Sequence, residues 1–224
     1  MEKEVLQYLD TLKNKVKNEI SNLLTDKDIA EISHEALLDY FDSKKSTPFY
    51  IYYSDTVSNK KLFLSDPDFF GKFKQQYSLQ GVDRGYLTRL EEDKAEILRL
   101  IETGEISTLY FKFFAEATIK HGEGSKQKSL GSFFAKLVHT FAPDKYCALD
   151  NPIKQHFGLE KESFFISFVV ISKAYKEWSI ENSVIMDRIK LELGSHTTDE
   201  SIKLKMTDLK LLDLIFWYRA NKIG

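Results

Sequence analysis

The chain has 224 residues, of which 42% are hydrophobic, 13% aromatic and 29% charged, so it can fill a packed core and is not a disordered polypeptide. Its formal net charge of -2 disfavours a protein that binds nucleic acid over its whole surface, because such proteins carry a basic excess. Cys147 is the only cysteine, which excludes an intrachain disulfide and a multi-cysteine metal cage.

The chain also lacks an apolar run that could span a membrane. Its longest apolar stretch, Phe164–Ile171, is far shorter than the roughly 20 residues that a transmembrane helix needs. Together with the single cysteine, this pattern predicts a cytoplasmic protein with no membrane partner.

The first half of the chain is expected to be mainly helical. Apolar residues within Val5–Leu24 recur at spacings of three and four, which is typical of an amphipathic helix. A second helix is expected at Asp26–Phe41 and should end before Pro48. The aromatic and β-branched residues of Phe49–Tyr53 favour extended structure, so we expect at most a small β-hairpin near residues 48–64.

Further helices are expected wherever the same periodicity runs between polar or glycine-containing breaks. They are Phe69–Tyr77, Arg84–Glu102, Ile106–Lys120, Ser129–Phe141, Asn151–Phe157, Lys161–Trp178, Ile180–Leu193 and Thr207–Asn221. The predicted fold class is therefore all-α, with one multi-helical domain over residues 1–224. Two packed helical lobes, 1–104 and 105–224, are the alternative division.

Several common enzyme motifs are absent. The chain has neither a Walker-type phosphate loop nor a GxGxxG after a predicted strand, so we expect no nucleotide cofactor. No histidine belongs to an HExxH motif, and we expect no metal site and no other cofactor. There is no GxSxG, and Cys147 lies in an apolar run that is typical of a buried, unreactive thiol.

One segment does combine residues that could carry chemistry. Leu130–Phe141 is predicted to be a turn that enters a helix, and this helix carries Lys136. After a short loop, Tyr146–Leu149 is an apolar run that leads into Asp-Asn-Pro. Proline favours the first turn of a helix, so Asp150 or Asn151 is predicted to cap the next helix.

This arrangement resembles the helix-hairpin-helix base-excision DNA glycosylase superfamily, particularly its oxoguanine-glycosylase-like branch. In that family a glycine-containing hairpin and a lysine-bearing helix precede an apolar loop that ends in an essential aspartate. Residues 126–132 stand here in place of the family's usual Leu-Pro-Gly-Val-Gly hairpin. Leu209–Tyr218 also resembles the closing helix of uncharacterised bacterial proteins that share the Lys, His, Pro and Asp core.

The resemblance implies a DNA-binding protein that hydrolyses the N-glycosidic bond of a damaged or modified base. Lys136 would match the lysine that attacks the sugar C1′, and Asp150 the carboxylate that stabilises the developing oxocarbenium charge. His139 and Asn151 are candidate pocket residues. The candidate nucleic-acid contacts are Lys126, Lys128, Ser129, Gly131, Ser132 and Lys154.

Without the resemblance, the same residues have simpler interpretations. Lys136 is then a solvated side chain of an amphipathic helix, Asp150 a helix cap, and His139 a structural histidine. The alternative function is a non-enzymatic helical interaction or regulatory module, in a stress or phage-defence context, that binds a protein or nucleic acid. A small-molecule enzyme with a pocket between two helical halves is a third alternative, and the net charge favours both alternatives over strong DNA binding.

Overall fold

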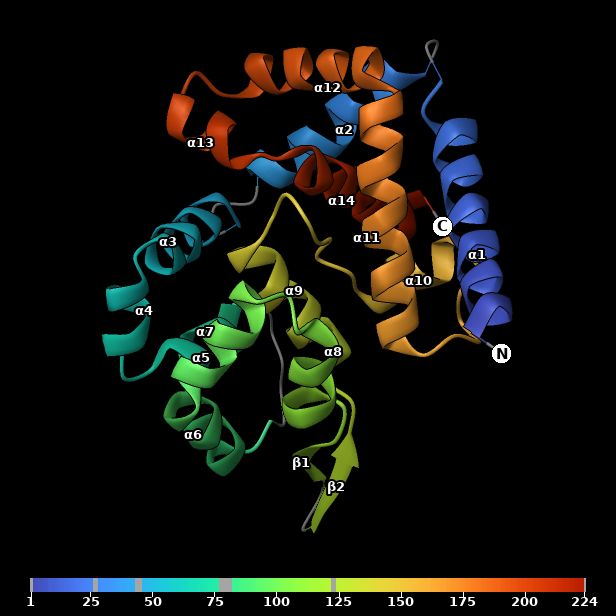
Figure 1. Ribbon diagram of the computed structural model, residues 1–224. Coiled ribbons are helices and arrows are strands. Elements are labelled where there is room, and N and C mark those ends of the chain that lie inside the picture. The colour runs from blue at the N-terminus through green and yellow to red at the C-terminus, as the bar shows by residue number, and fades with distance from the viewer. Residues whose placement is uncertain (1, 26–27, 43–45, 77–81, 122–123, 224) are drawn as a thin grey trace.

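The computed structural model describes residues 2–25, 28–42, 46–76, 82–121 and 124–223, and helices form most of it (Figure 1). This confirms the predicted all-α class. The helices of the first half are α1 (Glu2–Leu23), α2 (Ile29–Asp42), α3 (Ser46–Ser58), α4 (Lys60–Ser65), α5 (Phe69–Gln76), α6 (Arg84–Glu92) and α7 (Lys94–Glu102). None of the helices among these residues has the length and hydrophobicity needed to cross a bilayer.

The second half contains further helices and one hairpin. Its elements are α8 (Ile106–Leu109), the π-helix η1 (Tyr110–Phe114), β1 (Ala117–His121), β2 (Gly124–Lys128), α9 (Gly131–Phe141), α10 (Asn151–His156), α11 (Phe164–Glu181), α12 (Ser183–His196), α13 (Glu200–Lys205), α14 (Asp208–Tyr218) and the π-helix η2 (Arg219–Ile223).

The β-hairpin lies elsewhere than predicted. The extended structure favoured for Phe49–Tyr53 is wrong, because residues 48–64 form most of α3 and most of α4. Helix α3 packs against α9 and buries Thr56 and Val57, so tertiary contacts override the extended preference of an aromatic run that has no partner strand. The hairpin is instead β1–β2, an antiparallel pair in which Ala117 faces Lys128 and His121 faces Gly124.

Two predicted helices differ in detail from the structure. The helix expected at Ile106–Lys120 ends at Phe114, because the β-branched residues Thr118 and Ile119 belong to strand β1. The helix expected at Arg84–Glu102 is divided at Asp93, whose backbone leaves the helical conformation. Just after this break, the buried Lys94 donates a hydrogen bond to the backbone carbonyl of Asp66, which draws the chain toward α5.

Helices from the two ends of the chain lie side by side (Figure 1). Helix α1 packs along α11, where Lys13 Nζ lies 3.0 Å from Glu177 Oε1 and Trp178 Nε1 donates to Ser21 Oγ at 2.9 Å. Helix α2 packs against α12 and α14. The packing therefore crosses the division at residue 104, and the two lobes stay a prediction.

Aromatic side chains dominate the core between α4, α5 and α9. The rings of Phe63 and Phe69 meet edge to face with centroids 4.9 Å apart, and Phe73 meets Phe133 in the same way at 5.3 Å. Such pairs contribute beyond their buried area. This packing fixes the buried side of α9, the helix that carries Lys136.

Candidate functional site

Lys136 and Asp150 belong to one cluster of ionisable groups. Four side chains form it, and we call it the buried charge cluster: Lys136 from α9, Asp150 at the start of α10, and Lys210 and Asp213 from α14. Their charges act on one another, since the pKa of Lys136 responds to both aspartates and that of Asp213 responds to the other three groups. Two buried carboxylates and two half-buried lysine side chains thus share one region.

The carboxylate of Asp150 is held by the backbone and by an indole. Asp150 is the N-cap of α10 as predicted, and its Oδ1 accepts a hydrogen bond from the Ile153 N–H at 3.2 Å. The Trp217 side chain is a second hydrogen-bond partner. Burial raises the pKa of Asp150, while the charge of Lys136 and these two donors oppose that rise. The side chain is 8% exposed, so its position is well defined by its surroundings.

The loop that leads to Asp150 is anchored by three other elements. The Ala148 N–H donates to Asp213 Oδ2 on α14 at 2.5 Å, and the Cys147 N–H donates to Ser172 Oγ on α11 at 3.0 Å. From α9, His139 Nδ1 lies 2.7 Å from the Tyr146 carbonyl oxygen. These contacts place a carboxylate at a fixed position relative to α9.

The surroundings of Lys136 stabilise the neutral form of its amine relative to a lysine in water. Burial lowers the pKa of Lys136, and the charges of Asp150 and Asp213 act in the opposite direction without cancelling the effect. A lysine needs a neutral amine to act as a nucleophile, and a lowered pKa is the usual way to supply one. The sequence-predicted pair therefore has electrostatic properties compatible with its predicted chemistry.

Lys210 and Asp213 form a second oppositely charged pair, one turn apart on α14. Burial lowers the pKa of Lys210 to about 8 and raises that of Asp213 to about 7. Lys210 Nζ also lies 5.4 Å from the centre of the Tyr40 ring. Strongly perturbed ionisable groups gather at functional sites and also in structural ion pairs, so the cluster is chemically capable of either role.

The two candidate pocket residues have different settings. His139 is buried and binds the Tyr146 carbonyl, which requires a proton on Nδ1 and makes this histidine an anchor of the loop. Burial and the nearby Lys210 charge lower its pKa to about 3, so it is neutral. Asn151 is exposed as the first residue of α10, directly beside Asp150.

The candidate nucleic-acid contacts around the start of α9 are divided between surface and interior. Lys128 and Ser129 are exposed, and Ser132 is half-buried. Gly131 is buried against the Phe164 ring, leaving no space for a β-carbon. Lys126 lies in β2, and its side chain is outside the described part of the chain.

Lys154, the remaining candidate contact, is tied to the protein itself. Its amine donates to the backbone carbonyl of Glu162 and lies 3.4 Å from that of Glu160. Gly131 packs against Phe164, which is two residues after Glu162. Lys154 and Gly131 therefore both contact the short segment 162–164, and the structure brings these two candidate residues to one region.

Sequence reasoning missed the contribution of α14. Asp213 and Lys210 interact electrostatically with Lys136, and Trp217 binds Asp150, whereas the sequence predicted this helix without assigning these three residues to the site. A signal was present, because Asp213 is the one charged residue in the apolar run Leu211–Phe216. A carboxylate in such a run is buried on one face and needs a partner.

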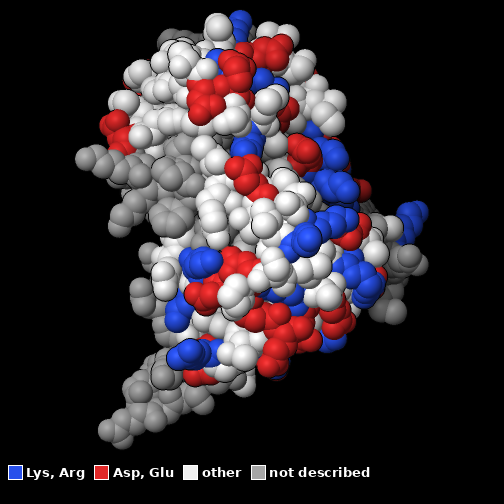
Figure 2. Space-filling model, turned by 90° about the vertical axis from the view of Figure 1, so that its left-hand side faces the viewer, with Lys and Arg blue, Asp and Glu red and all other residues white. Residues whose placement is uncertain are grey.

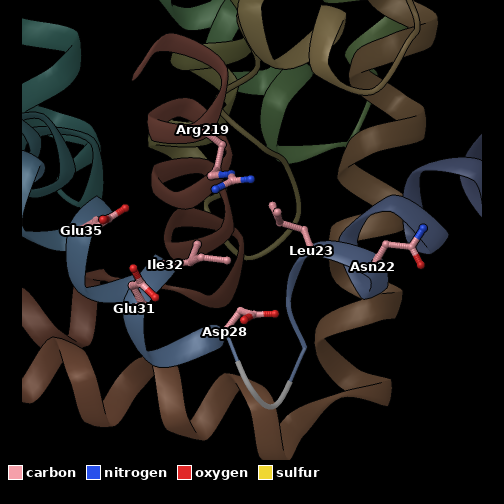
Figure 3. Close-up of a pocket in the computed structure, with 7 residues that line it drawn as sticks. All are labelled: Asn22, Leu23, Asp28, Glu31, Ile32, Glu35 and Arg219. Atoms are coloured by element: carbon pink, nitrogen blue, oxygen red, sulfur yellow. The ribbon is translucent and has the colours of Figure 1, made fainter. Parts of the chain in front are cut away.

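A pocket of about 280 Å³ lies apart from the predicted pair, between the end of α1, the start of α2 and Arg219 (Figure 3). Its polar lining includes three carboxylates, Asp28, Glu31 and Glu35, and the Arg219 guanidinium. None of the residues predicted for catalysis or nucleic-acid binding lines it. Its acidic lining is unsuited to a phosphate group.

The surface adds no broad basic region on the face shown in Figure 2, where Lys and Arg side chains alternate with Asp and Glu. Phosphate contacts would therefore have to be local, as the net charge also indicates. Comparison of the chain with protein-family models, with curated proteins and with solved structures gives no match.

Proposed function

We propose that this protein binds DNA and hydrolyses the N-glycosidic bond of a damaged or modified base, with Lys136 as nucleophile and Asp150 as stabilising carboxylate. One observation carries the proposal: an amine whose pKa is lowered by burial interacts electrostatically with a carboxylate fixed at the mouth of the following helix. These are the two groups that the sequence resemblance predicts for this reaction.

Lys136 and Asp150 have different roles in this reaction. The neutral amine of Lys136 forms a bond to the sugar C1′, and the base departs with the electron pair of the glycosidic bond and takes up a proton. The Asp150 carboxylate stabilises the positive charge that develops on the sugar ring. Loss of the amine proton and opening of the ring give an imine, which water hydrolyses to release the sugar and restore the amine.

The start of α9 offers a local contact for the DNA backbone. Leu130, which precedes the helix, provides no side-chain cap, and the uncapped N-terminus of a helix attracts anions. Lys128 and Ser129 are exposed immediately before this point. A phosphate held here would lie on the helix that carries Lys136.

A non-enzymatic interaction module is the second candidate, and a specific observation favours it. Asp150 is 8% exposed and already serves as the cap of α10, so its carboxylate has a structural role without any substrate. In this function the buried charge cluster stabilises the fold and performs no chemistry.

The test uses oligonucleotides that carry oxidised, alkylated or deaminated bases, with borohydride to trap an imine on the protein. We expect base release and a trapped adduct that both disappear in Lys136→Ala. Asp150→Asn should lower the rate by about 100-fold or more while preserving the helix cap, because asparagine caps helices as well as aspartate does. Lys173→Ala, which changes an exposed lysine of α11, is the matched control and should retain full activity.

Two outcomes would favour the second candidate. One is the absence of base release and of a trapped adduct on every substrate. The other is activity that persists unchanged in both Lys136→Ala and Asp150→Asn, which would remove these two residues from the reaction.

A further inference from the structure

The geometry points to a second site, which shares no residue with the buried charge cluster and binds a divalent first-row transition metal such as Zn²⁺. Its ligands are His34 from α2 and Glu192 and His196 from α12. One ligand atom from each residue lies within 4.8 Å of the other two. Two imidazoles and a carboxylate are a donor set that such ions prefer.

The distances fit a tetrahedral ion. His34 Nδ1 lies 2.8 Å from Glu192 Oε1, and His196 Nε2 lies 3.2 Å from the same oxygen. Donor atoms bound at roughly 2.0–2.1 Å to one tetrahedral ion are about 3.3–3.4 Å apart. Small side-chain rotations would therefore admit the ion, and its bonds would replace the present contact between His34 and Glu192.

A separate observation, at His196, also points to a ligand at this position. Its Nε2 is buried and makes no hydrogen bond with any of the described residues, although the Glu192 oxygen is near. The side chain is 9% exposed, so water can hardly supply the hydrogen bond that Nε2 lacks. An imidazole nitrogen without a partner costs free energy on burial, and a metal ion would satisfy it.

The rings and the carboxylate are already oriented by their neighbours. The His196 ring stacks on Phe41 with an interplanar angle of 8° and centroids 6.0 Å apart. Ser195 Oγ donates to Glu192 Oε1 at 3.0 Å. Such supporting contacts fix ligand geometry in metal sites, so less freedom is lost when an ion binds.

The three ligands come from two helices that are far apart in the sequence, so they form no sequence motif. Glu192 and His196 are four residues apart and share one face of α12, but His34 is 158 residues from Glu192 and comes from the other end of the chain. An ion here would join α2 to α12. Because the His34 side chain is 54% exposed, the fourth coordination position would face water.

Metal binding is measured on tag-free protein that has been treated with a chelator and dialysed. Calorimetric titration with Zn²⁺ should show one ion per chain, and Co²⁺ should give the visible absorption of a tetrahedral complex. Zn²⁺ should also raise the Tm, because binding to the folded state stabilises it. These measurements do not depend on base release, so they succeed or fail independently of the proposed glycosylase activity.

Substitution of each proposed ligand tests whether these three residues bind the ion. His34→Gln, Glu192→Gln and His196→Asn should each weaken Zn²⁺ binding at least tenfold, while Glu200→Gln, at an exposed carboxylate of α13, should not. His34→Gln is decisive, because His34 is exposed and its replacement leaves the core unchanged. Lack of saturable binding at one ion per chain, or equal affinity in His34→Gln and the original protein, would overturn the proposal.

Discussion

Asp213 Oδ2 accepts a hydrogen bond from the Ala148 N–H at 2.5 Å, which ties the closing helix α14 to the loop two residues before Asp150. The same carboxylate acts electrostatically on Lys136 and Lys210. One buried side chain thus connects the backbone that positions Asp150 with both amines of the buried charge cluster.

Replacing Asp213 with alanine should lower the free energy of unfolding by about 2–4 kcal/mol. The change leaves the Ala148 N–H without its acceptor and removes a buried carboxylate that interacts electrostatically with Lys210. Urea unfolding measures the effect. Asp208→Ala is the matched control, because Asp208 pairs with Lys190 at the surface at 2.7 Å and its loss should cost about 1 kcal/mol or less. Equal losses in the two variants would contradict this account.

Gly131→Ala should destabilise the protein by about 1–3 kcal/mol, although alanine is the better helix former. A β-carbon at Gly131 would overlap the Phe164 ring, so either the ring or the start of α9 must move. The control is Gly194→Ala in α12, where no atom lies within 4 Å of the added carbon. That variant should be as stable as the original or slightly more stable, and both are compared by thermal and urea unfolding.

His139 should make the protein acid-sensitive. Its folded-state pKa is about 3 and its ordinary value is 6.5, so between these values the unfolded chain binds a proton that the folded protein does not. Stability from this group is therefore complete above pH 6.5 and falls as the pH drops. At pH 5 the loss is about 2 kcal/mol.

Comparison with His139→Asn isolates this effect, because asparagine can still donate to the Tyr146 carbonyl but does not titrate. The free energy of unfolding should fall less in this variant between pH 7.5 and pH 5. The opposing contributions of Asp150 and Asp213, whose pKa values are raised, are present in both proteins. Parallel pH profiles for the two proteins would refute the assignment to His139.

Lys94→Ala should destabilise the protein by about 3 kcal/mol, far more than the loss of a surface lysine. Lys94 is 4% exposed, lies 2.5 Å from Glu91 Oε2 and donates to the Asp66 carbonyl. Its removal leaves the Glu91 carboxylate buried without that counter-charge. Lys112→Ala breaks an exposed pair with Glu96 and should cost no more than about 1 kcal/mol by urea unfolding.

Local patterns predicted much of the helical architecture. The amphipathic run within Val5–Leu24 corresponds to α1, and the helix expected at Thr207–Asn221 corresponds to α14 and η2, since the apolar period is a local property of the sequence. The segment Phe49–Tyr53 was misassigned because its composition favours a strand, while the contact of α3 with α9 decides its structure. Such a contact has no local signature.

The sequence likewise predicted only part of the candidate site. Asp150 or Asn151 was predicted as a cap because the Asp-Asn-Pro order defines one, and in the structure the cap is Asp150. Its link to Lys210, Asp213 and Trp217 was not predicted, because these residues lie about sixty positions later and meet it only through folding. The His34, Glu192 and His196 cluster was missed for the same reason.

The contact of α1 with α11 has a consequence for synthesis of the chain. Lys13 and Glu177, which meet across that seam, are 164 positions apart, so α1 leaves the ribosome long before its docking surface has been made. Helix α1 is therefore secured in this fold only after α11 has been translated.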